Sequence, residues 1–287
     1  MIKIHEYNSL NDGPTLIIFG AIHGNEICGP KAVEKVIKKI DSKKLILSKG
    51  RVIFVPISNP LAYSKNKRSI DQDLNRVFAK TSKPKTYEQK LANTLCGLID
   101  RSDILLDLHS TGAKGPPTVF LDFPTKTNTN LAKSTGINLA IVGWPELYKK
   151  DKRLISHDTI SYAHSKNKDC ILLECGQHQD SNAPNVAERA IIRILKYYRM
   201  IATSKGPVSS KYRKLKMIEM SELFIKENKN DSFSHPWKHL EIVKKGHVIG
   251  KRNSGKLIIS PNDRIMILPK YNPPIGKEWF YLGYYKK

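Results

Sequence analysis

The chain has 287 residues, enough for one large domain or for one domain with a smaller appendage. Hydrophobic residues make up 40% of it and no apolar run is as long as a membrane span, so we expect a soluble globular protein with no membrane partner. The net charge of +23 indicates a polyanion partner or a solvated surface biased toward anionic ligands. Because the lysines are scattered and no nucleic-acid motif is present, we expect no specific nucleic-acid partner. Residues 1–5 lack the apolar core of a signal peptide, so the cytoplasm is the expected compartment.

Strand and helix patterns alternate through the first two thirds of the chain. Residues 1–12 are predicted to be an edge strand or lead-in, and the polar segment 63–76 is too long for a tight connection, which makes it a candidate for function. Buried strands are predicted over 15–19, 51–56, 103–108, 119–123, 138–142 and 170–173. Helices are predicted over 30–40, after the capping box at 86–89, and over 186–201. This alternation predicts an α/β sheet covered on both faces.

The pattern changes after Ser204. Residues 205–210 resemble a linker, and short strand patterns follow over 240–243, 247–250, 257–259, 264–268 and 279–282. We therefore predict two domains, a catalytic domain over 1–204 and a small all-β domain over 205–287.

Four polar residues stand at or just beyond the predicted strand ends. His23 and Glu26 follow the first buried strand, His109 follows the strand over 103–108, and Glu174 follows the strand over 170–173. In open α/β sheets ligands bind beyond the carboxyl ends of the strands. Two His and one carboxylate around an open position form a catalytic zinc pattern, and the second Glu is then a candidate general base.

Each of these residues also has an ordinary structural interpretation. His23 could lie in a turn, Glu26 could be a carboxylate in the first turn of a helix, and His109 could be satisfied in a loop. Glu174 is harder to explain in this way, because a carboxylate beside a buried strand needs a partner. Taken together, the four residues favour a metal site.

Four ordered motifs carry a resemblance to a known family. They are H-G-N-E at 23–26, D-L-N-R at 73–76, D-L-H-S at 107–110 and L-E-C-G at 173–176. In this order they resemble the succinylglutamate desuccinylase/aspartoacylase family of zinc carboxypeptidase-like hydrolases. The resemblance implies a three-layer α/β domain with a mostly parallel central sheet, plus a C-terminal β domain that shapes the pocket entrance.

The resemblance also implies roles for individual residues. His23, Glu26 and His109 would bind one Zn²⁺ per chain, and Glu174 would act as base and proton shuttle. Arg68 would lie near the scissile carbonyl, where it could stabilise an oxyanion. Asn75 and Arg76 would contact the substrate carboxylate, which a guanidinium can bind in a bidentate way.

One departure from the family concerns the substrate. Aspartoacylases carry a further arginine before the base-bearing strand, but the matching stretch here, residues 156–164, has none. This puts N-acetylaspartate and N-succinylglutamate in doubt as substrates, and Arg153 or a lysine could take over that role. His157, His164 and His178 are interpreted as pocket-wall or surface residues.

The cysteines and a second histidine pair are interpreted as structural. Cys28, Cys96, Cys170 and Cys175 form no C-x-x-C pair and lie in apolar segments, so they are expected to be reduced and packed. The H-P-W-K-H stretch at 235–239 has spacing that could chelate a metal on a helix, but it contains a proline and lies in the β-rich region.

These observations predict a zinc-dependent amidohydrolase. It would cleave the amide bond of an N-acyl amino acid, or of a similar small anionic amide, with a metal-activated water and Glu174 as general base. Two alternatives remain open: a metallocarboxypeptidase that acts on peptide ends, and a basic polyanion-binding protein with a degenerate zinc pocket. A homo-oligomer is possible.

Overall fold

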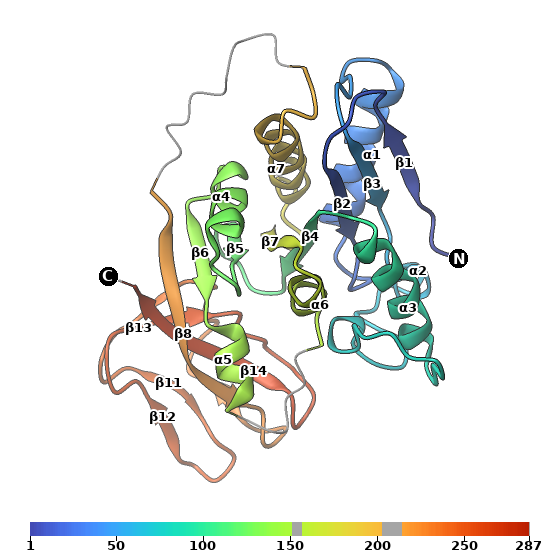
Figure 1. Ribbon diagram of the computed structural model, residues 1–287. Coiled ribbons are helices and arrows are strands. Elements are labelled where there is room, and N and C mark those ends of the chain that lie inside the picture. Colours follow the sequence, from blue (N-terminus) through green and yellow to red (C-terminus); the bar gives the residue numbers. More distant parts are fainter. Residues whose placement is uncertain (151–156, 203–213, 287) are drawn as a thin grey trace.

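The computed structural model describes residues 1–150, 157–202 and 214–286 (Figure 1). The strands are β1 (His5–Asn8), β2 (Thr15–Gly20), β3 (Arg51–Val55), β4 (Ile104–Thr111), β5 (Thr118–Phe120), β6 (Leu139–Val142), β7 (Asp169–Gln177), β8 (Lys216–Ile225), β9 (Ser232–Phe233), β10 (Ile242–Val243), β11 (Val248–Lys251), β12 (Leu257–Ile259), β13 (Arg264–Ile267) and β14 (Glu278–Tyr285). The helices are α1 (Cys28–Asp41), α2 (Pro60–Ser64), the 3-10 turn η1 (Leu74–Arg76), α3 (Tyr87–Asp100), α4 (Lys126–Ser134), α5 (Trp144–Lys149), α6 (Thr159–Ser165) and α7 (Ala183–Tyr197).

Eleven strands form one sheet in the order β1-β3-β2-β4-β7-β5-β6-β8-β14-β13-β10. β2 runs parallel to its neighbours β3 and β4, and β4 runs parallel to β7. Parallel strands that are buried on both faces carry unbroken apolar runs, which is the pattern of β2 and β3. The predicted α/β class is therefore confirmed, and β1 is the edge strand that the sequence suggested.

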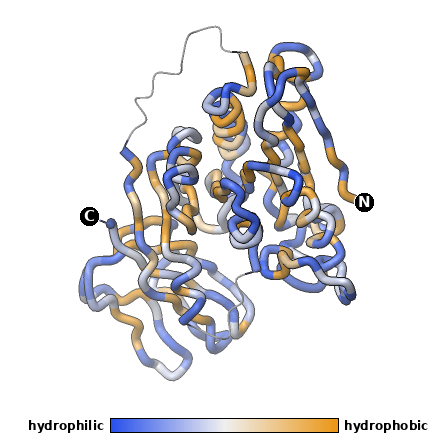
Figure 2. The backbone as a smooth tube through the Cα atoms, viewed as in Figure 1, coloured by the Kyte–Doolittle hydropathy of each residue, from blue (hydrophilic) through white to orange (hydrophobic). Residues whose placement is uncertain are grey.

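Helices cover both faces of this sheet. Successive side chains of a strand point to opposite faces, so Leu16 and Ile18 pack with α1 and α7, while Ile17 and Phe19 pack with α3 and α6. Figure 2 shows hydrophobic residues concentrated along the central strands and in α7. The result is a three-layer arrangement. None of the helices in the described ranges is long and apolar enough to cross a membrane.

The start of α3 shows how the sequence sets a helix boundary. Thr86 Oγ1 accepts a hydrogen bond from the backbone N–H of Gln89 at 3.2 Å, which is one half of the predicted capping box. The other half differs, because Gln89 Oε1 accepts from the backbone N–H of Lys85 at 2.7 Å. The helix still begins where the motif predicts.

The C-terminal residues extend the same sheet. β8 pairs in parallel with β6, and β14, β13 and β10 follow in antiparallel order. β9, β11 and β12 form a separate three-stranded antiparallel sheet (Figure 1). The predicted linker at 205–210 lies outside the described residues, and the division at residue 204 stays a prediction. The sheet itself continues from one predicted domain into the other.

The four cysteines are free and buried, as expected for packing residues.

Candidate active site

His23 and Glu26 lie in the loop between β2 and α1. His23 Nδ1 is 2.8 Å from Glu26 Oε1, and both residues are buried. Gly24, between them, passes so close to α2 that a Cβ there would lie 2.2 Å from the backbone of Ala62 and Tyr63. Only glycine allows this approach, which explains its place in the H-G-N-E motif.

His109 and Glu174 lie within strands rather than beyond them. β4 continues through Thr111 and β7 continues through Gln177, and His109 is paired in register with Glu174. Both strands are therefore longer than their apolar runs indicate. The difference arises because the parallel backbone pairing continues past the apolar residues while the polar side chains find partners of their own.

His23, Glu26 and His109 converge on one point. One ligand atom from each residue lies within 4.8 Å of the others. The Glu26 carboxylate faces both imidazoles, with Oε1 at 2.8 Å from His23 Nδ1 and Oε2 at 3.0 Å from His109 Nδ1. Two imidazole nitrogens and one carboxylate are the donor set of a catalytic zinc site, so the residues fit this metal. Within the described ranges no other group of three ligating side chains meets this criterion.

Two aspartates lie beside the outer nitrogens of these imidazoles, Asp73 in hydrogen-bonding geometry and Asp107 at ion-pair distance. Asp73 Oδ1 is 3.0 Å from His23 Nε2, and Asp107 Oδ2 is 3.0 Å from His109 Nε2. Carboxylates in this position fix the ring orientation and the tautomer of metal-binding histidines. The sequence reasoning gave neither aspartate a role, although the alternation of a strand places Asp107 on the same face as His109.

Glu174 has an unusual electrostatic environment. It is 8% exposed, and its Oε2 is a buried atom without a hydrogen-bond partner among the described residues. Burial, together with the negative charge of Glu26, raises the pKa of Glu174 to about 8. The pKa of Glu26 shifts the other way, because His23 and His109 outweigh its burial and hold that pKa well below its ordinary value. Two neighbouring carboxyl groups with opposite shifts are typical of an acid–base site.

Arg68 lies beside the metal-binding residues. Its Nε and Nη2 donate to Asp73 Oδ2 at 3.0 and 2.8 Å, and its Nη1 is 3.6 Å from Glu26 Oε1. The Arg68 side chain is 41% exposed, and the negative charges of Asp73 and Glu26 raise its pKa above the ordinary value. Its backbone carbonyl accepts from Gly24 N at 3.2 Å, so the loop that carries Arg68 is attached to the loop that carries the ligands.

Glu88 fixes the next part of the polar segment. Its carboxylate is fully buried and accepts the backbone N–H groups of Ile70, Asp71 and Gln72 at 2.7, 3.1 and 3.3 Å. It also accepts from Asn59 Nδ2 at 3.3 Å. The sequence analysis noted Glu88 only as part of a helix cap, but it anchors the chain between Arg68 and Asp73.

Asn75 and Arg76 lie in η1, and both are engaged by other residues. Asn75 Oδ1 accepts from Thr159 N at 3.0 Å. Arg76 Nη2 donates to Tyr148 Oη and to Glu278 Oε1, both at 3.1 Å. The structure thus places Arg76 near the site but pairs it with a carboxylate from β14, which the sequence analysis did not anticipate.

The stretch that lacks the family arginine is described only from residue 157 onward, so Arg153 lies outside the described residues. A different cation, Lys270, comes close to the site from the C-terminal region. Burial lowers the pKa of Lys270, Glu278 opposes this shift, and the positive charges of Arg68 and Arg76 add to it. Lys270 Nζ lies 3.2 Å from Glu278 Oε2, on the same carboxylate that pairs with Arg76.

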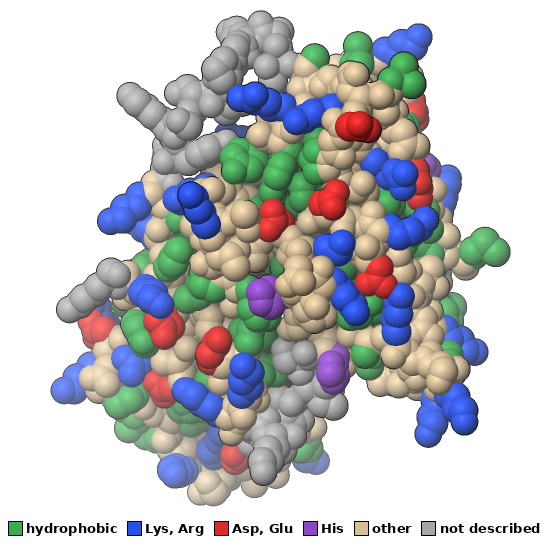
Figure 3. Space-filling model, in the orientation of Figure 1, with side chains coloured by type: hydrophobic (Ala, Val, Ile, Leu, Met, Phe, Trp, Pro, Cys, Tyr) green, Lys and Arg blue, Asp and Glu red, His purple; other side chains and the backbone are tan. Residues whose placement is uncertain are grey.

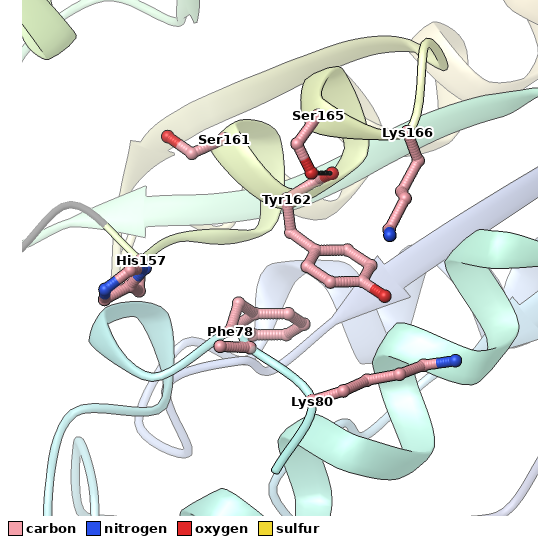
Figure 4. A pocket seen from close by; sticks show the side chains of 8 residues that line it. Phe78, Lys80, His157, Ser161, Tyr162, Ser165 and Lys166 are labelled. Atoms are coloured by element: carbon pink, nitrogen blue, oxygen red, sulfur yellow. Dashed lines mark hydrogen bonds between the residues drawn. The ribbon is translucent and has the colours of Figure 1, made fainter.

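The remaining histidines lie outside the metal group. His157 lines a separate hollow of about 390 Å³ between residues 78–80 and α6 (Figure 4). That hollow contains none of the predicted site residues. His164 stacks on Phe123 at 3.7 Å, and His178 Nδ1 is 2.9 Å from Ser110 Oγ. His239 is buried. The sequence gave no signal for three residues near Arg76, namely Tyr148, Lys270 and Glu278.

Comparison with known sequences places this geometry in a family. The succinylglutamate desuccinylase/aspartoacylase catalytic domain matches residues 12–198. The succinylglutamate desuccinylase of Shewanella frigidimarina (strain NCIMB 400) is 22% identical over 290 residues, covering 94% of this chain and 82% of that protein. The N-alpha-acetyl-L-2,4-diaminobutyric acid deacetylase of Halomonas elongata is 33% identical over 104 residues, covering 35% of this chain and 30% of that protein.

Solved structures share the fold over nearly the whole chain. A succinylglutamate desuccinylase/aspartoacylase from Rhodobacter sphaeroides has a TM-score of 0.76 at 18% identity, with 99% of this chain and 90% of that chain covered. The product-bound ectoine utilization protein EutE (DoeB) from Ruegeria pomeroyi has a TM-score of 0.77 at 17% identity, with 99% and 89% covered. Because the catalytic-domain match spans more than half of its residues, the chain belongs to the succinylglutamate desuccinylase/aspartoacylase family.

Proposed function

We propose that this protein hydrolyses the amide bond of an N-acyl amino acid, or of a similar small carboxylate-bearing amide, in a zinc-dependent reaction. The observation that carries the proposal is the convergence of His23, Glu26 and His109 beside Glu174, whose buried Oε2 has no hydrogen-bond partner among the described residues. The family, whose members act on acyl amino acids, supports the same class of substrate.

The reaction assigns a proton-transfer role to Glu174. A zinc ion held by His23, Glu26 and His109 would polarise the amide carbonyl and make water acidic enough to attack at neutral pH. Glu174 takes the proton of the attacking water and returns it to the leaving amine. Because the charge of Glu26 contributes to the raised pKa of Glu174, a cation that neutralises Glu26 favours the ionised, basic form of Glu174.

The basic residues bind the rest of the substrate. Arg68, which lies 3.6 Å from Glu26 and pairs with Asp73, is proposed to stabilise the oxyanion that develops on the carbonyl. Asn75 and Arg76 are proposed to contact the substrate carboxylate.

The names of the relatives differ in the acyl group and the amine. One of them is a succinylglutamate desuccinylase and another is a deacetylase for N-alpha-acetyl-L-2,4-diaminobutyric acid. Both names imply cleavage of the amide bond of an N-acylated amino acid, and we propose only this bond cleavage for the present chain.

The high net charge does not support a polyanion-binding function. Figure 3 shows Lys and Arg side chains spread over this face and interspersed with Asp and Glu, rather than gathered into a stripe. We therefore propose a small anionic substrate and no specific nucleic-acid partner. The cytoplasmic location and the homo-oligomer remain predictions.

Metal analysis and a substrate screen test the proposal together. We expect about one zinc per chain, and hydrolysis of N-acyl amino acids in preference to short peptides with a free C-terminus. Preference for the peptides would identify a carboxypeptidase instead. Salt-sensitive binding to nucleic acid that survives His23→Ala, with no hydrolysis, would favour the polyanion alternative. Absence of zinc, combined with hydrolysis that Glu174→Gln leaves unchanged, would overturn the proposal.

A further inference from the structure

The hollow between residues 78–80 and α6 lies apart from the candidate active site and has a composition of its own (Figure 4). Its most buried lining residues are aromatic: Phe78 is 2% exposed and Tyr162 is 9% exposed. Lys80, Lys166 and His157 line it as well, and all three are exposed. Its volume of about 390 Å³ is within the range of small-molecule sites.

Hydrogen bonds hold the two walls of this hollow together. Phe78 N donates to His157 O at 2.8 Å, and Thr159 N donates to Asn75 Oδ1 at 3.0 Å. Segment 75–78 is therefore attached twice to the start of α6. The Tyr162 ring, on α6 itself, is fixed at its other end, where Tyr162 Oη donates to Asp100 Oδ1 at 2.9 Å. The hollow is thus a preformed part of the fold.

The two lysines of the hollow differ in their partners. Lys80 Nζ pairs with Asp100 Oδ2, so those two charges cancel. Lys166 Nζ lies over the Tyr162 ring, 5.5 Å from its centroid, and no carboxylate among the described residues forms an ion pair with it. Burial and the hydrogen bond to Asp100 raise the pKa of Tyr162, so its hydroxyl group stays neutral. One positive charge therefore remains at the hollow.

The charged and aromatic groups lie on different sides of the hollow. Figure 4 shows the ammonium groups of Lys80 and Lys166 on the same side as the Tyr162 hydroxyl, with Phe78 and His157 on the other side. A ligand with a flat ring at one end and a single negative charge at the other fits this arrangement. The ring gains stacked or edge-on contacts with the aromatic residues, and the charge balances Lys166.

We infer that this hollow is a second ligand site, which binds a small aromatic monocarboxylate with its ring beside Phe78 and Tyr162 and its carboxylate beside Lys166. The site is separate from the proposed hydrolytic one, since neither the metal-binding residues nor Arg68 and Arg76 line it. The inference therefore does not depend on the proposed function.

Indole-3-acetate and indole-3-acetamide test this site, because they share a ring and nearly the same shape but differ by one charge. Isothermal titration calorimetry on the full-length protein should show indole-3-acetate bound about fivefold more tightly than the amide. Lys166→Met should remove this preference and leave the affinity for the amide unchanged. Lys166 is exposed, so the substitution should not affect folding. Lys90→Met is the matched control, at an exposed position of α3 outside the hollow, and should retain the preference.

Lys270→Met shows which of the two sites holds the ligand, because the proposed substrate site also offers cations to a carboxylate. This variant should bind indole-3-acetate as tightly as the wild type does. The inference is overturned if Lys270→Met weakens the binding and Lys166→Met does not. Equal binding of the two compounds to the wild type, or binding of neither, overturns it as well. None of these results concerns amide hydrolysis, so the proposed function is tested separately.

Discussion

The two ends of the candidate site are built in different ways. The metal end (His23, Glu26, His109 and Glu174) is supplied by the loop after β2 and by β4 and β7. These three strands are adjacent in the sheet, and the closest contact joins residues three apart in sequence. At the other end, Arg76, Tyr148, Lys270 and Glu278 form a hydrogen-bonded group that we call the Glu278 cluster. It joins η1 to β14 through a contact between residues 202 apart. The first end is set by strand pairing, and the second by docking of the C-terminal strands.

This difference separates the residues proposed for hydrolysis from those proposed for substrate binding. Strand pairing holds the metal end within a buried sheet, where a small shift would break several backbone hydrogen bonds. Residues 270 and 278, by contrast, lie on the C-terminal segment and contribute charge to the substrate end without touching the metal ligands. Under the proposed function, we expect substitutions of Lys270 and Glu278 to change substrate binding while the metal-binding residues stay the same.

Glu174→Gln should have the largest effect and should act on the metal end alone. We expect kcat to fall by about 10³-fold, since the amide cannot accept the water proton. Zinc content should stay at the wild-type level, because Glu174 is not in the ligand group. The measurements are steady-state kinetics and metal analysis on the same sample.

The matched control for this variant is Glu188→Gln. Glu188 on α7 is also largely buried and pairs with Lys39 on α1, in a helix–helix contact that includes none of the site residues. It should keep nearly full activity. An equal loss of kcat in both variants would mean that the effect comes from stability rather than from proton transfer.

Replacing each arginine by lysine should separate the two ends kinetically. Arg68→Lys should lower kcat by about 10²-fold with little change in KM, because it weakens a contact formed with the developing oxyanion.

Arg76→Lys should raise KM by about tenfold with kcat nearly unchanged, because the lost guanidinium hydrogen bonds act on the bound substrate and on Glu278. Arg264→Lys, at another Arg–Glu pair, controls for the substitution itself. The same pattern of kcat and KM in both variants would remove the distinction between the ends.

The two ends also differ in how far sequence reasoning could go. The metal group was predicted because its residues follow recognisable apolar strands, and the structure does bring His23, Glu26 and His109 together. The strands β4 and β7 were predicted too short, because apolar runs mark where a strand is buried and not where its backbone pairing stops. Asp107 was within reach of the same reasoning, through its alternation with His109.

The Glu278 cluster could not be predicted in this way. Nothing near Glu278 in the sequence marks it as a partner of Arg76, and the pairing depends on how β8 joins β6 to β14. β8 itself was not predicted, because its alternating charged and apolar residues follow a stretch read as linker. Long-range docking, and not local propensity, determines the substrate end.

Glu88→Gln tests whether the segment between the two ends must be fixed. In the wild type the Glu88 carboxylate accepts hydrogen bonds from backbone N–H groups. The glutamine amide would turn its own N–H group toward some of these donors and leave them unpaired, so we expect the free energy of unfolding to fall by about 2.5 kcal/mol. The measurement is urea unfolding. Glu34→Gln, at an exposed position of α1, is the control and is expected to change the stability little. If Glu88→Gln is as stable as the wild type, the carboxylate is not what anchors this segment.

His239 connects the two regions and should make their attachment sensitive to acid. Its Nδ1 accepts from Leu268 N at 3.1 Å, and its Nε2 lies 3.3 Å from Thr118 Oγ1 on β5, so the neutral ring links the C-terminal region to the sheet. Burial lowers its pKa to about 3. Between pH 6.5 and about 3, His239 therefore binds a proton in the unfolded chain but not in the folded chain.

The stability contributed by neutral His239 is therefore complete above pH 6.5 and declines as the pH falls. Relative to His239→Asn, which retains an acceptor for Leu268 N, the wild type should lose about 2 kcal/mol of unfolding free energy between pH 7 and pH 5. Urea unfolding at the two pH values measures this difference. Parallel pH dependence in the two proteins would show that His239 can be protonated without weakening the attachment of the C-terminal region to β5. In that case the pairing of β6 with β8, the apolar contacts around it and the Arg76–Glu278 ion pair would hold the C-terminal region to the rest of the sheet.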